Sequence, residues 1–296
     1  MLFLIGCSAP TPTATSISEA PTALTSSASL TATPTLRPPT LTPVPSTPTA
    51  TPEPPPATPE LTLPRRILFI GDSFSFWLDT HMKALAVSSN PPLALETASV
   101  TFGGATLKSL WRGDALKAVQ EGQWDVVVLE EDLSDPASNE NDFYDYVDKF
   151  DAEIRMIGAR TVLSMPWEYN GSYQPLRTAE IAQIYGTAGT DLDVTVAPVG
   201  LAWERAIKER PALNLYFQDN IHQSIAGEYL TLAVLYATIF EQSPEELTYL
   251  YTDIAPESEE YFLRELQEGW TGVTSDEAAF LQRIAWETVQ EYQAQQ

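Results

Sequence analysis

The sequence predicts an α/β protein, specifically a three-layer α/β/α sandwich around a parallel sheet. Short continuous apolar runs recur along the chain, and they are typical of strands that are buried on both faces. Segments with apolar residues at helical spacing separate these runs. Strands that alternate with helices favour a parallel sheet with helices on both of its faces.

The elements can be assigned in chain order. Apolar runs predict strands at 67–70, 126–129, 160–165 and 194–199, with a less regular candidate at 93–98. Helical spacing begins at Leu78, and it recurs at 106–120, 139–157, 200–209 and 224–241. Thr274 followed by Glu277 forms a capping-box pattern, which predicts a C-terminal helix.

The first 64 residues differ from the rest of the chain. They hold 15 of the 24 prolines, mostly among Thr, Ser and Ala. Such a composition buries too little apolar surface to offset the entropy of ordering, so we expect a Pro/Thr-rich linker over 8–64. The remaining residues, 65–296, are of a length that fits one domain.

The charge of the chain excludes some partners. The net charge is −24, of which the first 64 residues contribute only −2. A strongly acidic surface repels nucleic acid and anionic membrane, so nucleic acid is not expected as a partner. Solubility alone also explains this charge.

Cys7 is the single cysteine, so an intrachain disulfide is impossible. Leu4-Ile5-Gly6-Cys7 resembles the lipobox of bacterial lipoproteins, in which the cysteine is lipidated. A full signal carries a basic region and a longer apolar segment, so residues 1–7 are interpreted as a partial lipoprotein signal. The alternative is a chance apolar run with a free thiol. The adjoining Pro/Thr-rich stretch favours an extracytoplasmic protein whose lipid anchor is its only contact with the membrane.

The run RILFIGDSFSFW ends a predicted strand at Gly71-Asp72-Ser73. Ligands of parallel sheets bind beyond the carboxyl ends of the strands, so Ser73 lies where a nucleophile would act. Gly71 lets the backbone bend there without a side-chain clash. A helix starting just after Ser73 would aim its N–H groups at an oxyanion.

A nucleophilic serine needs a base, and the chain has two histidines. His81 falls on the apolar stripe of its predicted helix, which favours a structural role. His222 follows Asp219 by three residues in a polar segment, where the carboxylate can hold one ring nitrogen and leave the other free. The alternative for His222 is a helix-entry residue with no chemical role.

Together these motifs resemble the SGNH (GDSL-like) hydrolase superfamily, in particular its bacterial lipoprotein-like branch. Gly71-Asp72-Ser73 resembles the block with the nucleophile, and Phe102–Leu107 the block whose glycine N–H lines the oxyanion hole. Asp219-x-x-His222 resembles the block with the acid and base. The resemblance implies a flavodoxin-like sheet and a catalytic set of Ser73, Asp219 and His222. It also implies oxyanion donors at Ser73 and Gly104, with Gly103 in reserve.

One block departs from the superfamily. Its third block carries a side-chain amide that donates to the oxyanion, whereas Glu130 stands at the matching strand end. A carboxylate only accepts hydrogen bonds and repels the developing charge. Glu130 is therefore protonated, or replaced by another donor, or it weakens catalysis, unless it points away. If it sits at the oxyanion, Glu130→Gln should raise esterase activity.

The expected function is a cell-surface serine esterase that acts on small acyl esters, including those carried by carbohydrate. Alternatives are a ligand-binding lipoprotein without catalysis on the same scaffold, and an acyltransferase. No cofactor or metal is expected, because two separated histidines and one cysteine make no zinc-ligand set. The aromatic residues Trp167, Tyr169 and Tyr173 follow a predicted strand, where they could stack on sugar rings or pack the rim.

Overall fold

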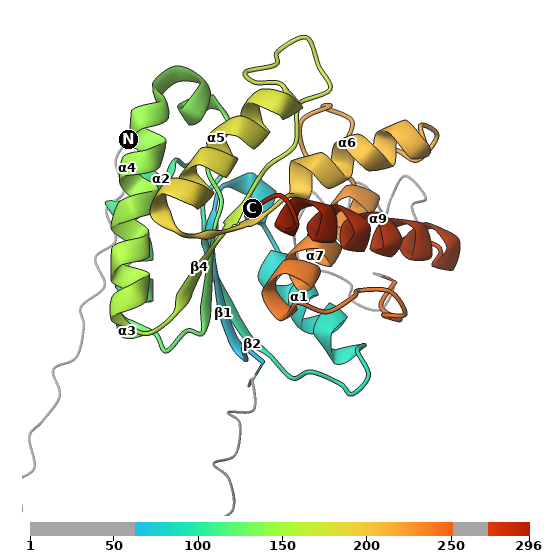
Figure 1. Cartoon of the computed structure of the whole chain (residues 1–296), viewed down its shortest axis with the longest axis horizontal. Coiled ribbons are helices and arrows are strands. Elements are labelled where there is room, and N and C mark those ends of the chain that lie inside the picture. The colour runs from blue at the N-terminus through green and yellow to red at the C-terminus, as the bar shows by residue number, and fades with distance from the viewer. Residues whose placement is uncertain (1–62, 251–271) are drawn as a thin grey trace, which may run out of the picture. The chain divides into compact units, whose positions relative to one another are not determined.

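Five parallel strands form the central sheet, in the order β2-β1-β3-β4-β5 (Figure 1). The computed structural model describes residues 63–250 and 272–296. The predicted lipobox with Cys7, and the predicted linker up to residue 62, lie outside the described residues. The strands are β1 (Arg66–Gly71), β2 (Glu96–Thr101), β3 (Val126–Leu129), β4 (Arg160–Ser164) and β5 (Thr195–Ala197).

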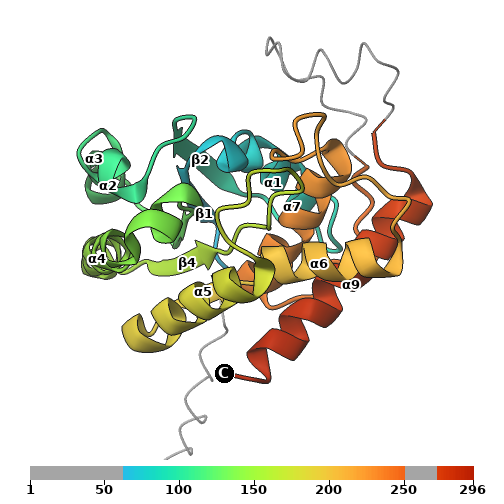
Figure 2. The same cartoon turned by 90° about the horizontal axis from the view of Figure 1, so that it is seen from above.

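Helices cover both faces of the sheet, which confirms the predicted three-layer α/β fold (Figures 1 and 2). One face carries α2 (Leu107–Trp111), α3 (Ala115–Glu121), α4 (Ser134–Met156) and α5 (Thr178–Leu192). The other face carries α1 (Leu78–Val87), α6 (Val199–Glu209), α7 (Ile225–Phe240) and α9 (Ser275–Gln293). A three-residue 3₁₀ turn, η1 (Ser73–Ser75), follows β1.

The layers explain the sequence pattern of the central elements. All four residues of β3 are buried, because helices lie above and below the strand. Every residue of α7 is also buried, since α9 packs along its outer side (Figure 2). The C-terminal helix is therefore the outer cover of α7. Its start carries the predicted capping box, in which Thr274 and Glu277 each bind the other's backbone N–H.

Several boundaries differ from the sequence-based expectations. The second strand is Glu96–Thr101, three residues later than the predicted segment. The helix expected over 106–120 is two helices, α2 and α3, which Arg112–Asp114 separates. Helix α5 was not predicted, although Ile181, Ile184, Tyr185 and Ala188 line its buried face. Its two glycines and its several threonines lower helix propensity and obscured that pattern.

The strand order places a topological switch point between β1 and β3. The chain leaves β1 toward β2 on one side, and leaves β3 toward β4 on the other. Ligands of open α/β sheets bind in the crevice at the carboxyl ends of such strands. Ser73 follows β1 and Glu130 follows β3, so both lie at this point. Among the described residues, no helix is long and apolar enough to cross a membrane.

Candidate active site

The turn after β1 carries Ser73 and is held by its own residues. Asp72 caps η1, because its carboxylate accepts a hydrogen bond from the Phe74 N–H at 2.7 Å. The sequence suggested an α-helix that begins directly after Ser73. The structure has the 3₁₀ turn η1 there, and α1 starts only at Leu78. Gly71 is required by space: a Cβ there would lie 2.3 Å from Ser75 Oγ and 2.5 Å from a carboxylate oxygen of Glu130.

The structure brings Ser73, His222 and Asp219 together, although Ser73 and His222 are 149 positions apart. Ser73 Oγ lies 2.8 Å from His222 Nε2. His222 Nδ1 lies 2.6 Å from Asp219 Oδ2. Each ring nitrogen thus contacts one partner, in the order that a proton relay from hydroxyl to imidazole needs.

The His222 loop is a tight turn. The Phe217 N–H donates to the His222 carbonyl, and the Asn220 N–H donates to the Phe217 carbonyl. Asn220 has a φ of 61°, a left-handed conformation that Asn tolerates better than most residues. The other carboxylate oxygen of Asp219 accepts from the N–H groups of Ile221 and His222, each at 3.0 Å. These bonds fix the carboxylate that faces the imidazole.

The hydrogen bonds to Asp219 also set its charge. Burial alone would raise the pKa of Asp219, but the bonds from the His222 ring and the two backbone N–H groups outweigh burial and lower it. Asp219 therefore stays ionised at and below the ordinary range of a carboxyl group. An ionised carboxylate holds the neighbouring ring N–H and stabilises the imidazolium that forms when the base takes a proton.

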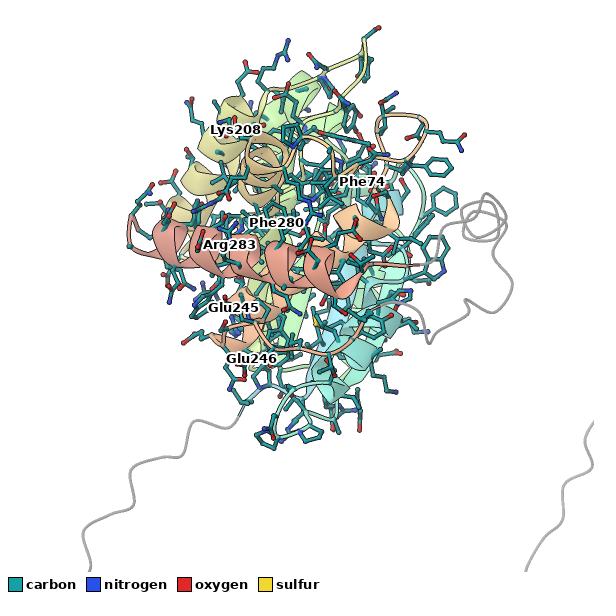
Figure 3. All side chains as sticks on the ribbon, turned by 90° about the vertical axis from the view of Figure 1, so that its right-hand side faces the viewer. Phe74, Lys208, Glu245, Glu246, Phe280 and Arg283 are labelled. Carbon is teal, nitrogen blue, oxygen red and sulfur yellow. The ribbon has the colours of Figure 1, made fainter. Side chains whose placement is uncertain are left out.

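A stack of aromatic rings joins the two halves of the site. Phe74 stacks on Trp167 with ring centroids 4.4 Å apart, and Trp167 stacks on Trp203 at 4.1 Å. The rings of Phe74 and His222 form a T-shaped contact, with their centroids 5.5 Å apart. Trp167 Nε1 donates to the Ile221 carbonyl at 2.9 Å, so the stack also holds the His222 loop. In Figure 3, Phe74 lies toward the opposite end of the molecule from Glu245 and Glu246.

Gly104 lies in the loop between β2 and α2. Its φ is 66°, and a Cβ would meet nothing within 4 Å, so the backbone conformation, not space, favours glycine here. The loop is tied to the nucleophile strand, because the Phe102 N–H donates to the Gly71 carbonyl at 3.2 Å. Within the described part of the chain, the N–H groups of Ser73 and Gly104 donate no hydrogen bond to protein atoms.

Glu130 does not have the environment expected of an oxyanion residue. It is 3% exposed, and its Oε2 accepts from the Asp72 N–H at 2.8 Å and from Ser75 Oγ at 3.0 Å. The carboxylate thus binds donors of the 72–75 turn, as expected of a group that only accepts. The alternative that Glu130 points away from the oxyanion fits these contacts, and the expected gain of activity in Glu130→Gln loses its basis.

The other histidine lies apart from the relay. His81 is 1% exposed on α1, and its Nδ1 contacts the Tyr249 hydroxyl at 2.7 Å. Burial lowers the pKa of His81 to about 4, so it is neutral at pH 7. In the described ranges, no group of three or more His, Cys, Asp or Glu side chains is placed to hold a metal ion.

The aromatic residues after β4 have two different environments. Trp167 is 2% exposed and Tyr169 is 6% exposed, so neither can stack on a sugar. Tyr173 is 61% exposed and packs with Tyr169 at a centroid distance of 6.3 Å. The sequence alone does not separate these residues, because all three follow the same strand.

The comparisons with known proteins bear on the fold. No protein-family model matches the chain, and no curated protein matches it. A proposed SGNH hydrolase from Slackia heliotrinireducens matches 59% of this chain and 98% of its own length, with 24% identity and a TM-score of 0.51. The chain has the SGNH-hydrolase fold.

Two further structures with this SGNH-hydrolase fold are more distant in sequence. A DUF4886 family protein from Bacteroides uniformis covers 76% of this chain and 95% of its own, with 14% identity and a TM-score of 0.55. A catalytic mutant of the acetylxylan esterase Axe2 from Geobacillus stearothermophilus covers 59% and 94%, with 14% identity and a TM-score of 0.50. Both neighbours share the fold of this chain at low sequence identity.

Some residues of the site were missed from the sequence. Asp72 was treated only as part of the Gly-Asp-Ser motif, whereas its carboxylate caps η1. Asp72 directly precedes the first residue of η1, and aspartate at this N-cap position is a known capping signal that could have shown this role. Phe74 and Trp203 gave no such signal, because their contacts with Trp167 join segments far apart in the chain.

Proposed function

We propose that this protein is a serine esterase that hydrolyses small acyl esters through Ser73, His222 and Asp219. The observation that carries this proposal is the continuous chain of contacts from Ser73 Oγ to His222 Nε2 at 2.8 Å, and from His222 Nδ1 to Asp219 Oδ2 at 2.6 Å. Nucleophile, base and orienting acid within hydrogen-bond reach are the requirements of acyl transfer by serine.

The reaction follows from these contacts. Ser73 Oγ attacks the ester carbonyl while His222 Nε2 takes the hydroxyl proton. His222 then gives this proton to the departing alcohol, which leaves an acyl group on Ser73. Asp219 holds the ring through Nδ1 in both steps. Water, activated by the same imidazole, attacks the acyl-enzyme and releases the acid.

The proposed oxyanion donors are the backbone N–H groups of Ser73 and Gly104. The loop that carries Gly104 is tied to the end of β1 by the Phe102–Gly71 hydrogen bond, which supports a place close to Ser73. Backbone donors fixed by two anchored loops need little reorganisation when charge develops. Glu130 has no part in this donor set.

The exposed side chains around the site favour a neutral ring in the substrate. Phe102 is 73% exposed directly after β2, and Tyr173 is 61% exposed after β4. Exposed aromatic rings next to a polar site are typical of a binding surface. Asp132 lies shortly after β3, and Asp219 contacts the His222 ring at 2.6 Å. The negative charges of these two carboxylates disfavour an anionic acyl group. An acyl ester on a carbohydrate fits these features, and the same fold carries an acetylxylan esterase.

Phe102→Ala tests this substrate class. We expect it to raise KM for an acetylated xylo-oligosaccharide by about 2- to 10-fold, the value of one ring contact, with KM for p-nitrophenyl acetate unchanged. Met156→Ala is the control, because it removes a side chain of similar exposure from the far end of α4. An equal change of KM for both substrates in Phe102→Ala would count against a sugar-binding role. If the wild-type protein releases acetate from neither substrate, the esterase proposal is rejected.

We further propose that the enzyme is held at the bacterial cell surface by a lipid on Cys7. Support comes from the Leu4–Cys7 motif and the Pro/Thr-rich stretch that follows it. When the full gene is expressed in bacteria, a fatty-acid label should enter the protein and be lost in Cys7→Ala. Equal labelling of both forms, or of neither, would reject this anchor.

A further inference from the structure

Two buried carboxyl groups flank the nucleophile at the ends of the adjacent strands β1 and β3. Asp72 directly precedes Ser73, and Glu130 directly follows β3. Glu130 Oε2 accepts from the Asp72 N–H and from Ser75 Oγ, which lie on either side of Ser73. One carboxylate oxygen of Glu130 thus accepts two hydrogen bonds from the turn that carries the nucleophile.

The two acids are buried next to each other. Asp72 is 2% exposed and Glu130 is 3% exposed, and the Asp72 N–H donates to Glu130 Oε2 at 2.8 Å. Two ionised carboxylates buried this close together would repel each other, and neither could donate a hydrogen bond to the other. Glu130 Oε1 is buried, and within the described residues no ordinary donor reaches it. A proton held between the two acids supplies the missing donor.

The surroundings keep this proton in place. Glu131 and Asp132 follow Glu130 along the chain. Burial first, and then the charges of these acids, raises the pKa of the phenols of Tyr169 and Tyr185. None of these groups is a cation that could neutralise two negative charges. Burial first, and then the repulsion between the two acids, raises the pKa of Asp72. Burial also raises the pKa of Glu130.

We propose that Asp72 and Glu130 share one proton, and that Glu130 is a positioning residue that holds Ser73 through the 72–75 turn. This inference rests on the proposed esterase function, since the position of Ser73 matters only if Ser73 reacts. Asp72 is the donor in this pair and Glu130 the acceptor. The Glu130 carboxylate then has three donors: the Asp72 carboxyl, the Asp72 N–H and the Ser75 hydroxyl.

The shared proton predicts two dependences on pH. At alkaline pH the pair loses its last proton, two buried charges repel, and kcat falls as the turn shifts. The folded state also holds a proton that the unfolded chain releases above the ordinary pKa of Asp, 3.8. The unfolding free energy that comes from the pair is therefore fully present below that pH, and it declines as pH rises toward the raised pKa.

Asp72→Asn is the decisive variant, because its amide donates to Glu130 and its carbonyl still accepts from the Phe74 N–H. Asp72→Ala should lower kcat by about 10²-fold with KM unchanged, the usual cost of a displaced reacting group. Asp72→Asn should recover most of this loss, extend activity to higher pH than the wild type, and flatten the decline of unfolding free energy with pH. Glu130→Ala should match Asp72→Ala if it folds.

The matched control is Asp125→Asn. Asp125 lies at the opposite end of the same two strands, where it accepts from the N–H groups of Arg65 and Arg66. The Asp125→Asn substitution should leave kcat unchanged, and it should not alter how kcat and the unfolding free energy depend on pH. The proposal is overturned if Asp72→Asn is as poor as Asp72→Ala, or if it keeps the alkaline loss and the stability slope of the wild type. If the wild type hydrolyses no ester, the proposed function fails, and the stability slope alone still decides whether the proton is shared.

Discussion

Ser73→Ala should lower kcat for p-nitrophenyl acetate by about 10⁴- to 10⁶-fold, the loss seen when the nucleophile of a relay of this kind is removed. The methyl group offers no oxygen to attack the carbonyl, so no acyl-enzyme forms. Stability should change little, because Ser73 is only partly buried and its Oγ contacts the partly exposed His222 ring. Steady-state kinetics and a thermal melt of the same preparation check both statements.

Ser89→Ala is the control for this substitution. Ser89 follows the end of α1, where its hydroxyl donates to the Ala86 and Pro91 carbonyls, away from the carboxyl edge of the sheet. It should keep wild-type kcat. Residual activity of Ser73→Ala above one tenth of the wild type would mean that another group reacts, and the proposed mechanism would have to be abandoned.

His222→Ala should cause a loss in kcat of the same order, about 10⁴- to 10⁶-fold, because base and nucleophile act as one unit. Without the imidazole, no group that the described residues place against Ser73 Oγ can accept its proton. The double variant Ser73→Ala/His222→Ala should therefore be no slower than either single variant. Kinetics of the three variants on one ester measure this non-additivity.

The second histidine supplies a matched comparison. His81→Gln removes an imidazole that is buried in α1 beside Tyr249, outside the relay. It should lower the melting temperature and leave kcat per folded molecule near the wild-type value. If His81→Gln were as inactive as His222→Ala while still folded, the assignment of His222 as the base would lose its support.

Much of the fold follows from the apolar pattern alone. The four residues of β3 and the apolar run that became α7 were visible because burial on all sides leaves no polar positions. Helix α5 was missed because Gly186, Gly189 and the threonines around them weaken helix propensity, whereas packing against α4 and α6 stabilises it. The break between α2 and α3 includes Gly113. The spacing of the apolar residues continues across this break, so periodicity alone predicted one helix.

The site was predictable only in part, for a physical reason. Spacing within one loop shows that Asp219 can reach His222, since three residues of a tight turn bring both groups together. The resemblance to a known fold was needed to join this loop to Ser73. The sequence left the direction of the Glu130 side chain open, because a strand end offers donors on both sides and only the fold shows which are near. Here the near donors belong to the 72–75 turn.

The central claim is that Ser73 is activated by His222, and covalent labelling tests it most directly. The wild-type protein is treated with a fluorophosphonate, digested, and the modified residue is identified by mass spectrometry. The account predicts a single adduct on Ser73, with labelling abolished in both Ser73→Ala and His222→Ala and retained in His81→Gln. An unlabelled wild-type protein, or an adduct on Ser73 that forms equally fast in His222→Ala, would contradict it and leave a scaffold without catalysis.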